Sequence, residues 1–101
     1  MKSSRKLRLT PEAGADVREI RRYTARQWGA RQRDVYYAHL NRGMRTLLDY
    51  PERGRPRDEL YVGCRSLPVE HHIVYYYLTD EEIVIDRVLH GSQDATEKVS
   101  P

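Results

Sequence analysis

The sequence has 101 residues, 39% of them hydrophobic, and 18 Lys and Arg against 15 Asp and Glu, for a net charge of +3. This length suits one domain with a modest core. We expect no membrane-spanning segment and no signal peptide, because no apolar run approaches the required length. The one cysteine, Cys64, excludes an intrachain disulfide and fits a reducing cytoplasm, with the thiol buried or incidental.

The first elements predicted are a strand and a helix. Arg5–Thr10 alternates basic and apolar residues, as a half-buried strand does. Thr10 suits an N-cap, Pro11 suits the first helical turn, and Gly29 suits the position just beyond the helix end. The helix between them is expected to turn one face inward, made of Ala13, Val17, Ile20, Thr24 and Trp28.

A second helix is predicted from about residue 31 to residue 50, where Pro51 ends it. Its apolar face is expected to contain Tyr37, Leu40, Met44, Leu47 and Leu48, with Tyr36 on the flank. The short break at Gly29 makes the two helices an antiparallel hairpin.

The segment 51–60 is irregular, since it holds two prolines, a glycine and three arginines. Three strands with tight turns are predicted within 61–70, 71–78 and 81–90. The middle strand is apolar throughout most of its length and should be central, whereas Pro68 puts its strand near an edge. The polar tail 91–101 is expected to be loosely held.

The order of elements predicts a single α+β domain over residues 1–101, with the helical hairpin packed on one face of a mostly antiparallel sheet. No further element remains to cover the other face of the sheet. We therefore expect that face to be open and available to a partner.

Several ionisable residues stand at strand ends. His71 and His72 point to opposite faces of a strand, so a strand start with one exposed ring is favoured over a metal site, and we expect no metal and no cofactor. Regular alternation would place Asp86 and His90 on the open face, although a bulge could reverse the end of the strand. His90 is a candidate for acid–base chemistry, or for a hydrogen bond to the backbone where the strand ends.

Two surfaces are candidates for binding. The first is basic and would meet nucleic acid or an acidic protein, unless Asp58, Glu59 and Asp86 neutralise it; its members are Arg55, Arg57, Arg65 and Arg87. The second is aromatic and lies on the helical hairpin, as core or as a protein-binding face: Tyr23, Trp28, Tyr36 and Tyr37.

Four stretches in this order and spacing resemble the ParE branch of the RelE/ParE superfamily of type II toxin–antitoxin systems. They are LTPEAGADVREIRRYTARQWG from Leu9, PERGRPRDEL from Pro51, CRSLPVEHHIVYYYL from Cys64 and IVIDRVLHGSQD from Ile83. The resemblance implies a helical hairpin on an antiparallel sheet. It also implies neutralisation by a ParD-like antitoxin, through which alone the toxin would meet operator DNA. We expect this antitoxin to contact Tyr23, Trp28, Tyr36, Tyr37 and Leu40.

The superfamily divides by mechanism. RelE-like members cleave mRNA on the ribosome, whereas ParE-like members inhibit DNA gyrase. Where the ribonucleases tend to carry basic strand residues, this chain has Leu67, Val69 and His72, and no Tyr follows His90. The resemblance therefore implies a gyrase inhibitor rather than an enzyme, with a target-facing set of Arg55, Arg57, Arg65, Arg87 and His90.

Two alternatives remain. One is a RelE-like endoribonuclease that uses His90, Arg65 and Arg87. The other is an antitoxin-binding module without toxicity.

Overall fold

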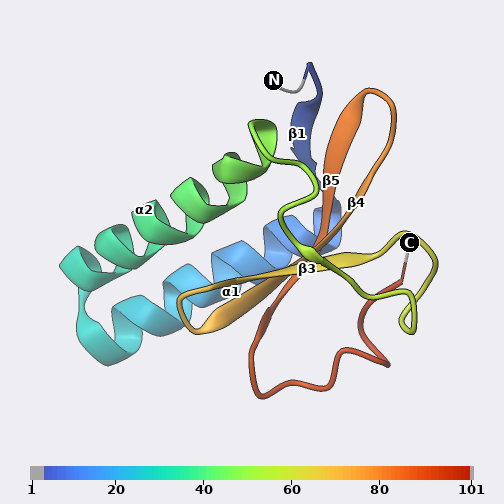
Figure 1. Ribbon diagram of the computed structural model, residues 1–101. Coiled ribbons are helices and arrows are strands. Elements are labelled where there is room, and N and C mark those ends of the chain that lie inside the picture. The colour runs from blue at the N-terminus through green and yellow to red at the C-terminus, as the bar shows by residue number, and fades with distance from the viewer. Residues whose placement is uncertain (1–3, 101) are drawn as a thin grey trace.

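The computed structural model describes residues 4–100 and has the predicted α+β architecture (Figure 1). The elements are β1 (Lys6–Leu9), α1 (Pro11–Trp28), α2 (Ala30–Arg45), a 3-10 turn (Thr46–Leu48), β2 (Arg55–Pro56), β3 (Arg65–Val69), β4 (His72–Leu78) and β5 (Glu82–His90). They form one five-stranded sheet in the order β1-β5-β4-β3-β2. β1 pairs with β5 in parallel and the other pairs are antiparallel. The central position predicted for β4 is confirmed.

The helix boundaries of α1 follow its capping residues. The Thr10 hydroxyl accepts the N–H of Ala13 at 3.0 Å, and Gly29 joins α1 to α2 with a φ of 93°, which favours glycine. Ala13, Val17 and Thr24 are buried as predicted. Trp28 is not, because it lies at the last residue of α1 beyond the sheet, and its side chain is 72% exposed.

The second helix is shorter than predicted. α2 ends at Arg45, and the chain then tightens into the 3-10 turn, so the expected single helix to residue 50 is wrong in its last turns. Its apolar face is nevertheless confirmed, because Leu40, Met44 and Leu47 are buried against Val74, Ile83 and other residues of the sheet.

A β-bulge changes which side chains of β5 face the helices. Tyr75 of β4 pairs with Arg87 and Tyr76 pairs with Ile85, which leaves Asp86 as an extra residue in β5. Ile83, Ile85 and Val88 all join the core beneath the helices, although Val88 has the opposite parity from the other two. The bulge thus reverses the alternation after Asp86.

Contacts from the start of α1 hold this bulge in place. The backbone N–H of Thr10 donates to the Ile85 carbonyl at 3.0 Å, and the Thr10 hydroxyl donates to the Asp86 carbonyl at 2.9 Å. One residue therefore caps α1 and also satisfies the irregular backbone of β5.

The second face of the sheet is covered, which corrects the expectation of an open face. Tyr75 and Leu89 are buried there beneath Cys64, Ala95 and Val99, with Leu60, Tyr61 and Ile73 packed around them. Two segments, residues 57–64 and the C-terminal tail, thus provide a second small core. The tail was expected to be loosely held, whereas Ala95 and Val99 are 7% and 5% exposed.

None of the helices in residues 4–100 is both long and apolar enough to cross a membrane.

Candidate functional site

A groove runs between the tip of the helical hairpin and the sheet edge where β4 begins and β5 ends. We call it the hairpin groove. Its lining is aromatic and imidazole-rich: Tyr23, Thr24, Trp28, Gln32, Tyr36, His39, Glu70, His71, His72 and His90. Its residues come from α1, α2, the β3–β4 turn and both strands, so only the folded chain assembles it.

Tyr36 is the centre of the groove's hydrogen bonds. Its hydroxyl accepts the backbone N–H of His71 at 3.0 Å and lies 2.6 Å from Nδ1 of His72. The tyrosine hydroxyl has one proton to donate, and we assign it to a hydrogen bond in which Nδ1 of His72 is the acceptor. The ring proton of His72 is then on Nε2. The Tyr36 ring also stacks parallel to the His71 ring, with centroids 6.4 Å apart.

His72 and His90 meet edge to face, with ring centroids 5.5 Å apart. Burial, followed by the nearby imidazoles of His90 and His71, lowers the pKa of His72 to about 4. His90 is exposed, and its Nδ1 lies 2.8 Å from the hydroxyl of Ser92 and accepts the Ser92 N–H at 3.2 Å. His72 is therefore neutral at pH 7, and Nδ1 of His90 is occupied by the turn after β5.

The bulge explains why His90 lies in this groove. Regular alternation placed Asp86 and His90 together on an open face away from the helices. Asp86 does lie on the face away from the helices, which is covered rather than open, whereas the placement of His90 is wrong. Asp86 is 5% exposed and accepts a hydrogen bond from the Tyr61 hydroxyl at 3.1 Å on the covered face. Burial raises the pKa of this carboxyl.

The predicted aromatic surface is partly assembled. Tyr23 and Trp28, which are 55% and 72% exposed, meet Tyr36 in the hairpin groove. Tyr37 is partly buried against the core, and the Arg21 guanidinium lies 4.6 Å from the centroid of its ring. Leu40 is 0% exposed in the core and cannot contact a partner in this conformation, which corrects its place in the binding set.

The predicted basic surface divides into two parts. Arg55, Arg57 and Arg65 lie together, since Arg55 and Pro56 of β2 pair with Ser66 and Arg65 of β3. Arg87 and His90 lie on β5, with β4 between them and β3.

Three of the four arginines are held by neighbours. Arg57 pairs with Glu59 at 2.7 Å. Arg65 donates to the Gly54 carbonyl at 2.7 Å. Arg87 forms a bidentate pair with Asp16. Within residues 4–100, the Arg55 side chain is exposed and has no hydrogen bond or ion pair of its own.

Comparison with known proteins identifies the family. Residues 7–95 match the family model described as the ParE toxin of the type II toxin–antitoxin system parDE. The chain is 37% identical to Toxin ParE of Escherichia coli, over 85% of this chain and 84% of that protein. It is 36% identical to Toxin ParE1 of Mycobacterium tuberculosis strain H37Rv, over 91% of this chain and 94% of the relative.

The chain belongs to the ParE toxin family. Toxin ParE1 of Caulobacter vibrioides, 32% identical, matches 87% of this chain and 91% of its own length. A solved structure titled as the chromosomal ParDE TA system from P. aeruginosa superposes with a TM-score of 0.76 at 20% identity, covering 86% of this chain and 96% of the other. This likeness confirms that the helical hairpin on a sheet is a fold shared with that structure.

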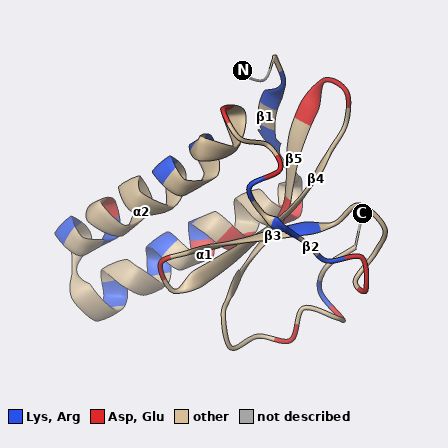
Figure 2. Cartoon of the chain, in the orientation of Figure 1, with Lys and Arg blue, Asp and Glu red and all other residues tan. Residues whose placement is uncertain are grey.

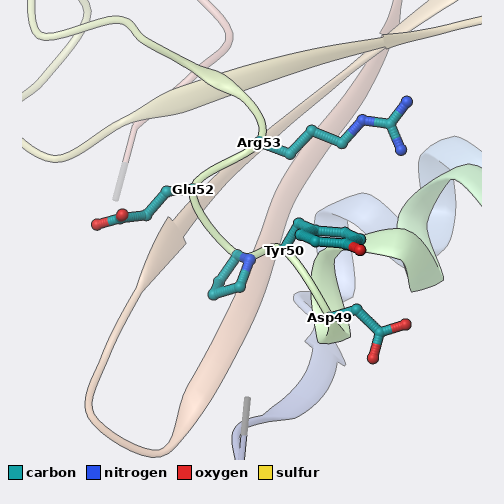
Figure 3. A pocket seen from close by; sticks show the side chains of 5 residues that line it. Asp49, Tyr50, Glu52 and Arg53 are labelled. Atoms are coloured by element: carbon teal, nitrogen blue, oxygen red, sulfur yellow. The ribbon is translucent and has the colours of Figure 1, made fainter. Parts of the chain in front are cut away.

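One exposed aromatic residue of this ParE-family chain was not predicted from the sequence. Tyr50, which is 68% exposed, follows the 3-10 turn and lines a shallow hollow with Asp49, Pro51, Glu52 and Arg53. Figure 3 shows Glu52 pointing to the side opposite Arg53 and Tyr50. The shortened second helix exposes Tyr50, and the helical periodicity of the sequence carried no signal for this.

Proposed function

We propose that this ParE-family toxin is held inactive by a ParD-like antitoxin in the cytoplasm and, when released, inhibits DNA gyrase by protein contact. The observation that supports inhibition over mRNA cleavage is the state of the cationic side chains. Arg65 and Arg87 already donate to carbonyl and carboxylate oxygens, and His72 is neutral. A phosphoryl-transfer site needs cations that are free to stabilise the charge of the transition state.

The hairpin groove is the proposed docking site for the antitoxin. Tyr23 and Trp28 present large apolar surfaces to solvent, and Tyr36 supplies a preorganised ring whose hydroxyl is already satisfied. Exposed aromatic residues around a groove are typical hot spots for a protein partner. An antitoxin segment that folds on binding would cover this surface and bury the exposed Trp28.

The target-facing surface is proposed at the β2–β3 edge, with Arg55 as its leading residue. Arg55 offers an exposed guanidinium, whereas Arg57 and Arg65 are partly engaged and shape the surface around it. His90 lies on the other side of β4 and is proposed as a second contact at the end of β5. Arg87 is proposed to orient this end of β5 from its pair with Asp16.

The deciding experiment is induced expression without antitoxin, with pulse labelling of DNA and protein synthesis over the following minutes. Gyrase inhibition predicts that DNA synthesis fails first and that the purified chain blocks supercoiling in vitro. An Arg55→Ala variant should lose much of this inhibition, and Arg42→Ala, an exposed arginine of α2, should retain it.

The two alternatives give different results in the same experiment. If translation stops first and mRNAs are cut within ribosomes, the chain is an endoribonuclease and His90 becomes the residue to mutate. If growth continues while the chain accumulates and still binds antitoxin, it is a binding module without toxicity. Either result would overturn the gyrase proposal.

A further inference from the structure

A second candidate site lies on the outer face of the helical hairpin, away from the hairpin groove. Four guanidinium groups from two helices surround one shallow hollow, whose lining is Arg18, Arg21, Arg22, Ala25 and Arg33. We call it the arginine hollow. Figure 2 shows the basic segments recurring along both α1 and α2. We propose that the arginine hollow binds the phosphate backbone of duplex DNA.

The charge of the arginine hollow is poorly neutralised. Within residues 4–100, Arg18 makes no side-chain hydrogen bond or ion pair, and the Arg21 guanidinium lies 4.6 Å from the centroid of the Tyr37 ring without a carboxylate partner. Arg22 pairs with Glu19 at 3.3 Å and Arg33 pairs with Asp34 at 3.0 Å. The side chains of Arg22, Glu19 and Asp34 are exposed, and that of Arg33 is partly buried. Exposed ion pairs contribute little, so a phosphate can replace these carboxylates.

The arrangement suits a chain of phosphates better than a single one. Arg18, Arg22 and Arg26 follow one another at i, i+4 spacing, which advances about 6 Å along the helix at each step. All three are exposed, and Arg26 shares the Glu19 carboxylate with Arg22. A row of guanidinium groups matches the repeated charges of a nucleic-acid backbone, which Arg binds in bidentate fashion.

The lining favours phosphate over an acidic protein segment. A protein partner needs apolar anchors to desolvate at the centre of its interface. The arginine hollow provides Ala25 as its one apolar residue, whereas the exposed aromatic rings Tyr23 and Trp28 line the hairpin groove. At 100° per residue, Tyr23 lies about 140° around α1 from Arg18 and about 100° from Arg22, so these two arginines lie on a different side of the helix from Tyr23.

Direct contact between the arginine hollow and DNA would be separate from the proposed function and would not depend on gyrase. It also departs from the expectation that the toxin meets operator DNA only through the antitoxin. The hollow would add a direct phosphate contact, independent of DNA sequence, wherever the chain is brought near DNA.

The test is the binding of the purified full chain to a labelled duplex of roughly 20 base pairs, followed by fluorescence anisotropy between about 50 and 200 mM salt. Three to four phosphate contacts predict a slope of log affinity against log salt of about −3. The double variant Arg18→Gln/Arg22→Gln should lose roughly tenfold in affinity and reduce the magnitude of the slope by about 2.

The matched control is Arg42→Gln/Arg45→Gln, which removes the same charge from exposed positions at the other end of α2, about 14 and 18 Å from Arg33 along the helix. This control should lose less than about threefold in affinity for the duplex. Thermal unfolding of both variants should match the parent chain, because all four side chains are exposed.

Equal losses in the two double variants would show that only net charge matters and would overturn the proposal. The proposal would also be overturned if inorganic phosphate displaced the duplex far more effectively than chloride does at equal ionic strength. That result would indicate a site for single phosphates. A labelled Glu-rich peptide that binds more tightly than the duplex, and that also needs Arg18 and Arg22, would reassign the hollow to an acidic protein partner.

Discussion

Asp16 of α1 accepts hydrogen bonds from Nε and Nη2 of the Arg87 guanidinium, at 2.7 and 2.9 Å, and from the backbone N–H of Val88 at 2.9 Å. β1 pairs with β5 only as far as Ile85, so within residues 4–100 the next part of the β5 edge has no strand partner on that side. The Asp16 carboxylate takes the place of that missing strand. Both side chains are largely shielded, at 14% and 21% exposure for Asp16 and Arg87.

Replacement of Asp16 should therefore destabilise the fold. Asp16→Ala leaves the Val88 N–H and the Arg87 charge without their acceptor, and we expect a loss of about 3 kcal/mol in the free energy of unfolding. Urea denaturation measures it. Glu19→Ala, on the same helix but with exposed partners, should change stability much less. An equal effect of the two variants would contradict the edge-capping role of Asp16.

Two glycine-to-alanine substitutions should change the free energy of unfolding in opposite directions. A Cβ on Gly54 would lie 2.6 Å from both Cε1 and the hydroxyl of Tyr76 and 3.0 Å from the Ser66 carbonyl. The Tyr76 hydroxyl is held there, because it accepts the Gly54 N–H and donates to the Pro51 carbonyl. Gly54→Ala should cost about 1–3 kcal/mol in the free energy of unfolding.

The companion substitution is Gly14→Ala within α1, where the new Cβ meets only the Arg18 guanidinium at an ordinary 3.5 Å. It should stabilise the chain by about 0.5–1 kcal/mol, because alanine loses less backbone entropy in a helix. Thermal unfolding of the two variants measures both effects. A neutral Gly54→Ala would mean that the loop after Tyr50 can move away from Tyr76.

His72 should make stability fall in acid. Its pKa is lowered to about 4 from an ordinary value of 6.5, so the folded state favours the neutral ring. The unfolded chain therefore binds more protons between these values, and stability is lost as the pH falls from 6.5 towards 4. At full effect the shift corresponds to about 3 kcal/mol, and solvent contact of the partly exposed ring reduces it.

The measurement is urea denaturation at pH 7 and at pH 4.5, with the His72 titration followed by NMR. His72→Gln keeps an acceptor for the Tyr36 hydroxyl and should flatten the pH dependence over this range. His39→Gln, which changes an exposed imidazole on α2, serves as the control. A His72 ring that titrates near pH 6.5 would show that it is not shielded as the groove requires.

Antitoxin binding should depend on Trp28 far more than on Tyr50. The two are similarly exposed, at 72% and 68%, but only Trp28 lies in the hairpin groove. Trp28→Ala should weaken the antitoxin complex by roughly thirtyfold, as expected for a hot-spot aromatic residue, and Tyr50→Ala should leave it nearly unchanged. Calorimetry with the cognate antitoxin measures both, and a larger loss from Tyr50→Ala would move the docking site to the hollow of Figure 3.

The local elements could be predicted from neighbouring residues. Thr10 and Gly29 define the ends of α1 through capping and a positive φ, and Leu40 and Met44 define the inward face of α2 through helical spacing. The family resemblance was equally readable, since its motifs extend along most of the chain. These features depend on the geometry of neighbouring residues or on the order of residues, and both can be read from the sequence.

The site depended on contacts between distant parts of the chain. Asp86 became the extra residue of a bulge held by Thr10, 76 residues away, and this reversed the side on which His90 lies. The sequence indicates a surface group at Arg87, whereas in the structure Asp16, 71 residues away, binds it. The alternation of a strand predicts which face each side chain points to only while the pairing register is regular. A charged side chain is available to a partner only if no residue distant in the sequence already binds it. Composition, capping and family were thus determined by the sequence alone, whereas register, burial and the pairing of charges were decided by the tertiary structure.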